Sequence, residues 1–349
     1  MSAPLPPAAA LRRIAFLLER AREATYRVAA YRSAAAVVDG LGEAELDRRI
    51  RTKTLTDLKG IGPKTATAIV QAHGGQVPEY LATLEEAYAA ELPAADDVAA
   101  FRAALRGDLH AHSDWSDGGS PIREMAEAAM ALGHEYLALT DHSPRLTVAN
   151  GLTPERLERQ LDVVAELNTE LAPFRILTGI ECDINVDGSL DQTDELLGRL
   201  DVVVASVHSD LRADRRAMTD RMLAAVAHPH TDVLGHCTGR LVIGRKQRNG
   251  TQRPRPESDF DAEAVFSACV EHGTAVEINS RPERLDPPRR LLTLAVELGC
   301  EFAIDTDAHA PGQLDWQYNG CERAIECGVP VERVINTRPA DELLAWTTG

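Results

Sequence analysis

The 349-residue sequence has no run of about 20 apolar residues, the length that a membrane-spanning helix needs, so it predicts no transmembrane segment. Its start lacks a cationic segment followed by an uninterrupted apolar stretch, so we expect no signal peptide and a cytoplasmic protein. The six cysteines include no CxxC pair, and in a cytosolic chain we expect reduced, mostly buried thiols. Only four lysines occur, so arginine carries nearly all the positive charge.

The net charge of −17 is unevenly distributed along the chain. Residues 1–90 contain 12 Lys and Arg against 10 Asp and Glu, whereas the remaining residues carry a net charge of −19. This asymmetry predicts two units with different partners. The acidic unit repels the phosphate backbone of nucleic acids unless metal ions or a local basic patch reverse its charge.

The pattern of apolar residues divides the chain into a helical part and an α/β part. Residues 8–90 keep apolar residues at the three-to-four spacing of helices, and residues 91–105 read as an Ala-rich, acidic helix or linker. After Arg106, short β-type runs alternate with helix-length amphipathic stretches, the pattern of parallel βαβ units. We therefore predict an all-α domain at 1–90, a linker at 91–105 and an α/β domain at 106–349.

The α/β part contains seven strand candidates. Each ends in polar or metal-binding residues: RGDLHAH, YLALTDH, RILTGIECDI, VVVASVH, DVLGH, AVEINS and FAIDTDAH. Functional side chains at the carboxyl ends of parallel strands are typical of a barrel active site. Seven strands are one fewer than the usual eight, so we predict a distorted (β/α)7 barrel.

Histidine is concentrated at these strand ends. Six of the eleven histidines lie there, and three carboxylates occupy equivalent positions: His110, His112, His142, His208, His236, His309, Asp117, Glu181 and Asp307. The i, i+2 spacing of His110 and His112 places both imidazoles on one face of a strand, and Asp307 and His309 repeat this spacing. Isolated, structurally satisfied core histidines are the alternative, but six at successive strand ends indicate a metal site.

These nine side chains exceed the needs of one ion, because a catalytic zinc site uses about three protein ligands and a water. They suit two or three divalent ions that share bridging carboxylates. Nitrogen and oxygen donors without thiolates fit Zn²⁺, Mn²⁺ or Fe²⁺ better than Ca²⁺ or Mg²⁺. Close-set ions can activate a bridging water and bind the attacking and leaving oxygens of an in-line displacement. We expect no organic cofactor.

Several motifs in register resemble the PHP (polymerase and histidinol phosphatase) family. They follow in that family's order over about residues 106–345: DLHAHSDWSDG, LTDHS, GIECDI, SVHSD, GHCTGR and DTDAH. The resemblance implies a distorted seven-stranded barrel with a trinuclear metal centre that hydrolyses phosphoesters, and it implies the same nine side chains as ligands. One position departs from the family: many relatives have His-Pro where this chain has His236-Cys237. This thiol is either a neutral buried substitution or a change in metal preference and oxidation sensitivity.

Further residues next to these motifs are candidates for supporting roles. We expect Asp108 and Asp141 to orient the neighbouring ligands. Asn279 and Arg281 follow the AVEINS strand and are candidates to contact the substrate phosphate, with a rim ion pair as the alternative for Arg281. We interpret the other histidines as structural: His73, His134, His228, His230 and His272.

The segment 240–255 contains six Lys and Arg and no acid. Because it follows the DVLGH strand directly, we expect it at the mouth of the site, where Arg240, Arg245 and Lys246 would guide a nucleic-acid backbone. The alternative is a solvated, flexible loop without a partner.

The N-terminal part contains a second phosphate-binding pattern. The spacing LxGxGxxxAxxI over residues 58–69 resembles a helix-hairpin-helix, in which Gly60, Gly62 and Lys64 would contact a DNA backbone without reading sequence. A plain helix-packing turn is the alternative. The wider stretch resembles the N-terminal domain of family X DNA polymerases, but Ala68 stands where that family can carry a lyase lysine. The two units are also too close together to enclose a polymerase core.

Together these features predict a metal-dependent phosphoesterase acting on DNA, either a 3′–5′ exonuclease or a 3′-end phosphatase. One alternative is a small-molecule phosphatase resembling histidinol phosphatase. Another is a non-catalytic DNA-binding scaffold with a structural metal site. The sequence does not predict an oligomeric state.

Overall fold

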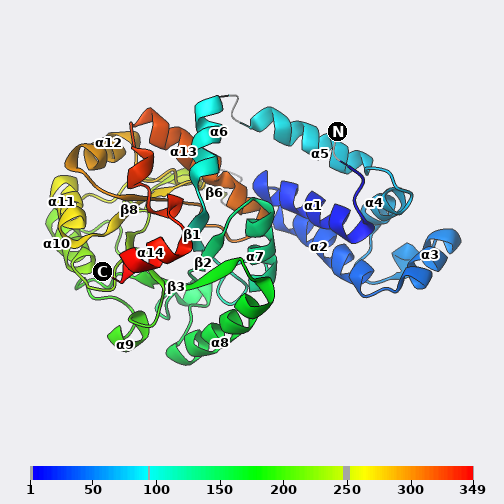
Figure 1. Cartoon of the computed structure of the whole chain (residues 1–349), viewed down its shortest axis with the longest axis horizontal. Helices are drawn as coiled ribbons and strands as arrows, with labels where there is room; N and C mark the ends of the chain where they lie inside the picture. The colour runs from blue at the N-terminus through cyan, green and yellow to red at the C-terminus, as the bar shows by residue number, and fades with distance from the viewer. Residues whose placement is uncertain (1–2, 93–94, 247–251, 349) are drawn as a thin grey trace. The chain divides into compact units, whose positions relative to one another are not determined.

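The computed structural model describes residues 3–92, 95–246 and 252–348 (Figure 1). The chain divides into two compact units, Met1–Ala94 and Ala95–Gly349. None of the helices in the described ranges combines the length and apolar character needed to cross a membrane.

The described part of the first unit is helical. Its elements are α1 (Pro7–Arg20), α2 (Thr25–Asp39), α3 (Glu43–Thr52), η1 (Leu55–Asp57), α4 (Pro63–His73) and α5 (Glu79–Glu91). On α1, Leu11, Ile14 and Leu18 are completely buried at the three-to-four spacing that predicts one apolar helix face. They belong to the core that joins α1 to α2 and α4.

The turn between η1 and α4 depends on glycine. Gly60 has a φ of +99°, where other residues are strained, and a Cβ there would lie 3.2 Å from Val37 Cγ2. Ile61 is buried in the core, and the Gly62 N–H donates to Thr65 Oγ1 (2.9 Å) at the start of α4. The turn therefore packs closely on α2 and presents the first turn of α4 outward.

The second unit is a barrel of seven parallel strands in the order β1-β2-β3-β4-β5-β8-β9. Its strands are β1 (Gly107–Ala111), β2 (Tyr136–Leu139), β3 (Arg175–Asp183), β4 (Val202–Ser206), β5 (Val233–Leu234), β8 (Ala275–Asn279) and β9 (Phe302–Asp305). These are the seven predicted strands, and the predicted fold class is confirmed.

Helices surround the barrel strands (Figure 1). The longer ones are α6 (Asp96–Ala104), α7 (Ile122–Ala131), α8 (Pro154–Leu171), α10 (Arg215–Val226), α11 (Ala262–His272), α12 (Arg289–Leu298), α13 (Gln317–Glu326) and α14 (Ala340–Thr347). Short helices complete the unit: η2 (Thr147–Ala149), α9 (Asp194–Leu197), η3 (Pro311–Trp316), η4 (Val331–Arg333) and η5 (Ile335–Thr337).

Alternate strand residues face two different cores. On β4, Val202 and Val204 belong to a cluster made mainly of strand residues inside the barrel. Val203 and Ala205 belong to the larger cluster that includes helix residues such as Phe266. This period-two alternation fills both faces of β4 with apolar side chains, whereas its polar residues follow at the carboxyl end.

The barrel closes between β9 and β1. Ala111 and Ala308 form an isolated parallel bridge, and the His112 N–H donates to the Ala308 carbonyl oxygen (2.8 Å). The Leu109 N–H also donates to Asp305 Oδ1 (2.8 Å). Closure brings the segments that follow β1 and β9 side by side.

The basic segment 240–255 contains a β-hairpin, not the predicted loop. Its strands β6 (Leu241–Lys246) and β7 (Gln252–Arg255) form a separate antiparallel pair. The Val242 N–H donates to the Glu283 carbonyl oxygen (2.7 Å), which attaches the hairpin to the segment after β8. The run Leu-Val-Ile was the available signal for a strand. The side chains of Arg245 and Lys246 lie outside the described residues.

Residues 96–104 of the predicted linker form α6, which belongs to the second unit and packs against α13. The buried Arg102 of α6 lies with its Nη2 3.1 Å from His134 Nε2. Burial, and then the charge of Arg102, lowers the pKa of His134 to about 3. His134 is therefore a neutral, structural residue at neutral pH.

We expect His134→Asn to make folding less sensitive to acid. Because the folded-state pKa lies below the unfolded value of about 6.5, neutral His134 stabilises the fold above that pH, and this contribution is lost as the pH falls towards about 3. Urea denaturation across this range should show a shallower loss of unfolding free energy in the variant. Exposed His272→Asn should follow the wild-type curve, and equal slopes in all three proteins would contradict the assignment.

Candidate metal centre

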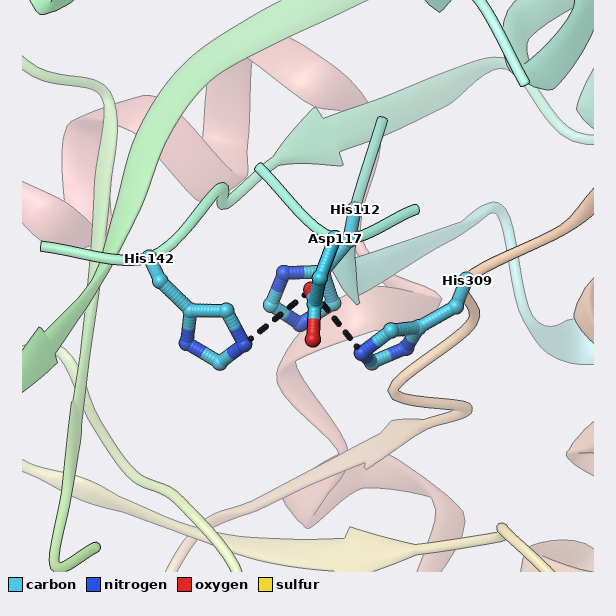
Figure 2. Close-up of side chains that lie close together, drawn as sticks. All are labelled: His112, Asp117, His142 and His309. Atoms are coloured by element: carbon cyan, nitrogen blue, oxygen red, sulfur yellow. Dashed lines mark ion pairs between the residues drawn. The ribbon is translucent and has the colours of Figure 1, made fainter. Parts of the chain in front are cut away.

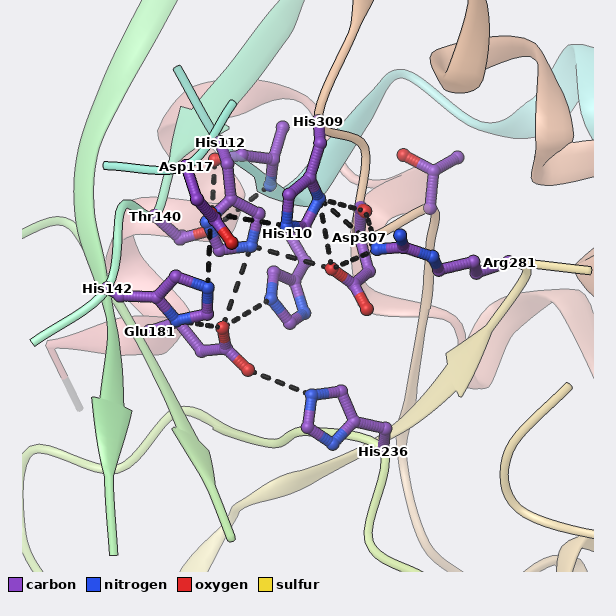
Figure 3. A network of polar contacts seen from close by, with 12 residues as sticks. His110, His112, Asp117, Thr140, His142, Glu181, His236, Arg281, Asp307 and His309 are labelled. Carbon is purple, nitrogen blue, oxygen red and sulfur yellow. Dashed lines mark hydrogen bonds and ion pairs between the residues drawn. The ribbon is translucent and has the colours of Figure 1, made fainter. Parts of the chain in front are cut away.

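The polar residues predicted at the strand ends lie together at one end of the barrel (Figure 3). Because all seven strands run parallel, their carboxyl ends face the same way. Six strands or the segments after them supply the nine side chains: His110, His112 and Asp117 from β1, His142 from β2, Glu181 from β3, His208 from β4, His236 from β5, and Asp307 and His309 from β9.

The buried carboxylate of Glu181 lies at the centre of this group (Figure 3). Its oxygens lie close to ring nitrogens of five histidines: His142 (2.8 Å), His236 (2.9 Å), His208 (3.2 Å), His110 (3.4 Å) and His112 (3.6 Å). Burial alone would raise the pKa of Glu181, but the charges of His208, His110 and His142 hold it well below its usual range. The carboxylate is therefore ionised.

Three groups of side chains have ligand atoms close enough to hold an ion. In the described part of the chain, the atoms of each group lie within 4.8 Å of one another: His112, Asp117, His142 and His309; His110, His112 and Asp307; and His142, Glu181 and His208. Figure 2 shows the first group, in which Asp117 Oδ1 lies 3.3 Å from His309 Nε2 and 3.4 Å from His142 Nε2. His112 and His142 each belong to two groups.

One central donor, His112, has the chemical state that divalent ions need. Burial, with the nearby charges of His309 and His142, lowers the pKa of His112 well below its usual range, so its imidazole is neutral at neutral pH. His110 Nε2, His112 Nε2 and Glu181 Oε2 are buried and have no hydrogen-bond partner among the described residues. Such groups are costly unless a further partner binds them. The donor set therefore fits divalent ions that favour nitrogen and oxygen ligands.

Two further acids contact the outer ring nitrogens, and the strand-end pattern does not select either of them. Glu277 Oε1 lies 2.6 Å from His110 Nδ1, and Asp183 Oδ1 lies 2.5 Å from His208 Nδ1. Carboxylates at this position orient metal-ligating imidazoles. The available signal was the i, i+2 spacing of Asp183 from Glu181 along β3, which places both on one strand face.

Asp108 and Asp141 bind backbone groups of the site. Asp108 Oδ1 accepts the His110 N–H (3.0 Å). Asp141 accepts both the Ser113 N–H (2.8 Å) and the Ser113 hydroxyl (2.6 Å). Each carboxylate therefore fixes the main chain beside a predicted ligand, Asp141 doing so in the loop that carries Asp117.

The two predicted substrate contacts differ in accessibility. Asn279 is completely buried, whereas the Arg281 side chain is 24% exposed at the rim. Arg281 Nη1 lies 3.3 Å from Asp307 Oδ1, so the rim ion pair considered above is present. Arg284, which the sequence patterns did not select, contacts the other oxygen of the same carboxylate (Nε to Oδ2, 2.8 Å). Two arginines therefore hold Asp307.

The predicted DNA contacts lie in different units. Gly60, Gly62 and Lys64 form the turn and first helical residues of the helix pair in the first unit, and Lys64 is exposed. Arg240 follows β5, and its Nε donates to the Arg284 carbonyl oxygen (3.1 Å). The guanidinium of Arg240 therefore supports the loop that carries Arg284.

Cys237 is buried next to His236, and its Sγ lies 3.9 Å from Asp286 Oδ1. Burial raises the pKa of the thiol well above its usual range. A protonated thiol is not the form that binds metals, so this geometry favours the neutral substitution.

Residues 108–314, more than half of the chain, match the profile of the PHP domain. The chain belongs to the PHP domain family. Residues 6–73 match the profile of a helix-hairpin-helix domain. Both resemblances predicted from the motifs are confirmed, and the protein is a hydrolase acting on phosphoester bonds. This outcome argues against the non-catalytic scaffold.

Relatives with different names match this PHP protein. It is 40% identical over 242 residues to the "DNA polymerase/3'-5' exonuclease PolX" of Bacillus subtilis, covering 69% of this chain and 41% of that protein. It is 28% identical over 243 residues to a probable phosphatase of Edwardsiella ictaluri, covering 66% and 90%. A Lactococcus lactis histidinol phosphate phosphatase structure with zinc, L-histidinol and phosphate matches with 19% identity and a TM-score of 0.45, covering 64% and 92%.

We expect Glu181→Gln and Asp117→Asn to lose different amounts of bound metal. Because Glu181 contacts five imidazoles, its variant should lose more than one ion per chain, whereas Asp117→Asn should lose at most one. Metal content after loading with Mn²⁺ and gel filtration gives these numbers, with circular dichroism as the control for folding. Equal losses in the two variants would show that Glu181 is not central.

Proposed function

We propose that this protein is a metal-dependent phosphoesterase acting on the 3′ ends of DNA, as a 3′–5′ exonuclease or a 3′-end phosphatase. The observation that carries the proposal is one chain containing both convergent metal-type donors and a helix-hairpin-helix unit. The name of the Bacillus subtilis relative, which includes a 3′–5′ exonuclease, supports this substrate. The chain spans 41% of that relative, so the shared activity is proposed for the matched part alone.

The nine convergent side chains would hold two or three ions of Mn²⁺, Zn²⁺ or Fe²⁺. When bound, such ions lower the pKa of a coordinated water and neutralise the charge of a phosphodiester. Arg281, partly exposed at the rim beside Asp307, would bind a phosphate oxygen of the substrate. Arg284, which is less exposed than Arg281, contacts the other oxygen of Asp307 and would fix the position of this carboxylate.

The helix-hairpin-helix turn is the part of the chain suited to hold a DNA backbone. Pro63, the first residue of α4, has no N–H, and the Gly62 N–H donates to Thr65 Oγ1 (2.9 Å), so the N–H groups that the first turn offers are those of Lys64 and Thr65. They lie beside a turn where a Cβ on Gly62 would meet nothing within 4 Å. Exposed Lys64 adds a positive charge at the same place. Contacts of this kind bind phosphates without reading sequence, as an end-processing enzyme requires.

A small-molecule phosphatase is the second candidate. The match to the Edwardsiella ictaluri probable phosphatase covers 90% of that protein and 66% of this chain, so a chain of about the size of the second unit carries that name. On this alternative the first unit contributes no substrate contact.

We expect His110→Ala and Asp307→Asn to lower hydrolysis by about 100-fold or more while leaving DNA affinity nearly unchanged, because both residues lie in the donor groups of the barrel. A 5′-labelled duplex with a 3′ overhang and histidinol phosphate would be tested in parallel with Mn²⁺, and with chelator as control. A chelator-sensitive ladder of shortened DNA supports the nuclease. Phosphate release from histidinol phosphate alone supports the phosphatase, and full activity in both variants excludes the proposed centre.

We expect Lys64→Glu to weaken DNA binding several-fold and to reduce the slope of log affinity against log salt by about 1, as for the loss of one phosphate contact. Hydrolysis of a small ester should not change, because Lys64 lies outside the barrel unit. The matched control is Arg216→Glu, which reverses a 91% exposed charge on α10. If both reversals weaken DNA binding equally, the hairpin makes no specific contact.

A further inference from the structure

Glu277 lies on β8, the barrel strand that supplies none of the nine predicted donors. Its side chain is completely buried, although a carboxylate is costly to bury without partners. Its partners are two of the predicted ligands, His110 and His236, and the neighbouring Asn279. This combination points to a role in the metal centre for a residue that does not itself belong to a donor group.

One oxygen of Glu277 determines how His110 is oriented. Oε1 lies 2.6 Å from His110 Nδ1. Because a carboxylate oxygen accepts hydrogen bonds, Nδ1 carries a ring proton in this geometry, which leaves Nε2 as the nitrogen that can lose its proton to a metal ion. His110 Nε2 is buried without a hydrogen-bond partner among the described residues, and it lies 3.4 Å from Glu181 Oε2.

The other oxygen holds a second ligand by its main chain. Oε2 accepts the His236 N–H (2.5 Å) and a hydrogen bond from Asn279 Nδ2 (3.2 Å). The ring of His236 then lies with Nε2 2.9 Å from Glu181 Oε1. One carboxylate therefore connects β1, the segment after β5, and β8.

The carboxylate form is essential to this arrangement. A neutral amide can accept at only one of its two terminal atoms, whereas His110 and His236 contact different oxygens of Glu277. In an amide variant one of these two N–H groups would face another donor.

We propose that Glu277 is a positioning residue that fixes the tautomer of His110 and the backbone of His236, so that both present Nε2 to the centre. The inference rests on the proposed metal centre, since it assigns a purpose to the orientation of two of its ligands.

The tautomer can be measured in the wild-type protein loaded with diamagnetic Zn²⁺, which requires a ligating His110 Nε2 to be free of its proton. Long-range ¹H–¹⁵N spectra of chain labelled with ¹⁵N-histidine, with His110 assigned by its absence in His110→Gln, should show a proton on Nδ1 and none on Nε2. A His110 ring protonated on Nε2 would overturn the inference. This measurement does not depend on any variant of Glu277 folding.

The second test measures Zn²⁺ affinity by competition with a chromophoric chelator, together with the visible spectrum of the Co²⁺-loaded protein. We expect Glu277→Gln to bind at least one ion about 10–100-fold more weakly and to alter the cobalt spectrum. The control is Glu301→Gln, whose carboxylate accepts from Trp346 Nε1 (2.7 Å) just before β9, at the other end of the barrel. Its Zn²⁺ affinity should equal that of the wild type.

The outcomes separate the two hypotheses. A wild type that binds no Zn²⁺, Mn²⁺ or Co²⁺ refutes the metal centre. A wild type and a folded Glu277→Gln with equal Zn²⁺ affinities and identical cobalt spectra refute the positioning role and leave the centre intact. If circular dichroism shows that Glu277→Gln does not fold, the tautomer of His110 decides.

Discussion

The attraction between one ionised carboxylate and a ring of imidazoles determines the architecture of the barrel end. Glu181 contacts histidines supplied by β1, β2, β4 and β5, so these strands have to finish at matching positions around β3. In a medium of low dielectric such contacts are strong, but the cost of removing the charges from water is also large. The close approach of β3 and β4 helps to bring these side chains together. It requires glycine at position 179, two residues before Glu181, because a Cβ there would lie 2.8 Å from the Val202 carbonyl oxygen.

The two units differ in net charge, and this difference affects how the protein can bind a polyanion such as DNA. Residues 91–349 carry a net charge of −19, against +2 for residues 1–90, and this negative charge opposes the approach of a polyanion. Positive charge is present near the centre as Arg281 and Arg284, but both are engaged with Asp307. Under the proposed function, binding of DNA therefore depends mainly on the helix-hairpin-helix unit, whereas the barrel supplies the chemistry and the contact proposed for Arg281.

The strands and the donor residues of the site could be predicted from the sequence, whereas the residues that support these donors could not. Parallel strands that end in donors show a local pattern, so the strands and the nine side chains could be found without knowing any contact. Glu277 and Arg284 could not, because their importance depends on the register that brings β8 beside β5 and β9. The contacts of Asp108 and Asp141 with backbone groups also depend on tertiary geometry. The hairpin of β6 and β7 was missed because its basic composition outweighed a short apolar run.

Exposure is graded across the donor groups. Glu181 and the two β1 histidines are almost inaccessible, whereas the side chains of His309 and Asp117 are 18% and 37% exposed. Whatever enters from solvent therefore meets Asp117 and His309 first, next to Arg281. The donor groups therefore lie at different depths below the surface. An ion bound at the deeper groups should exchange with solvent more slowly than one bound near Asp117 and His309, so exchange rates would distinguish sites that have similar affinities.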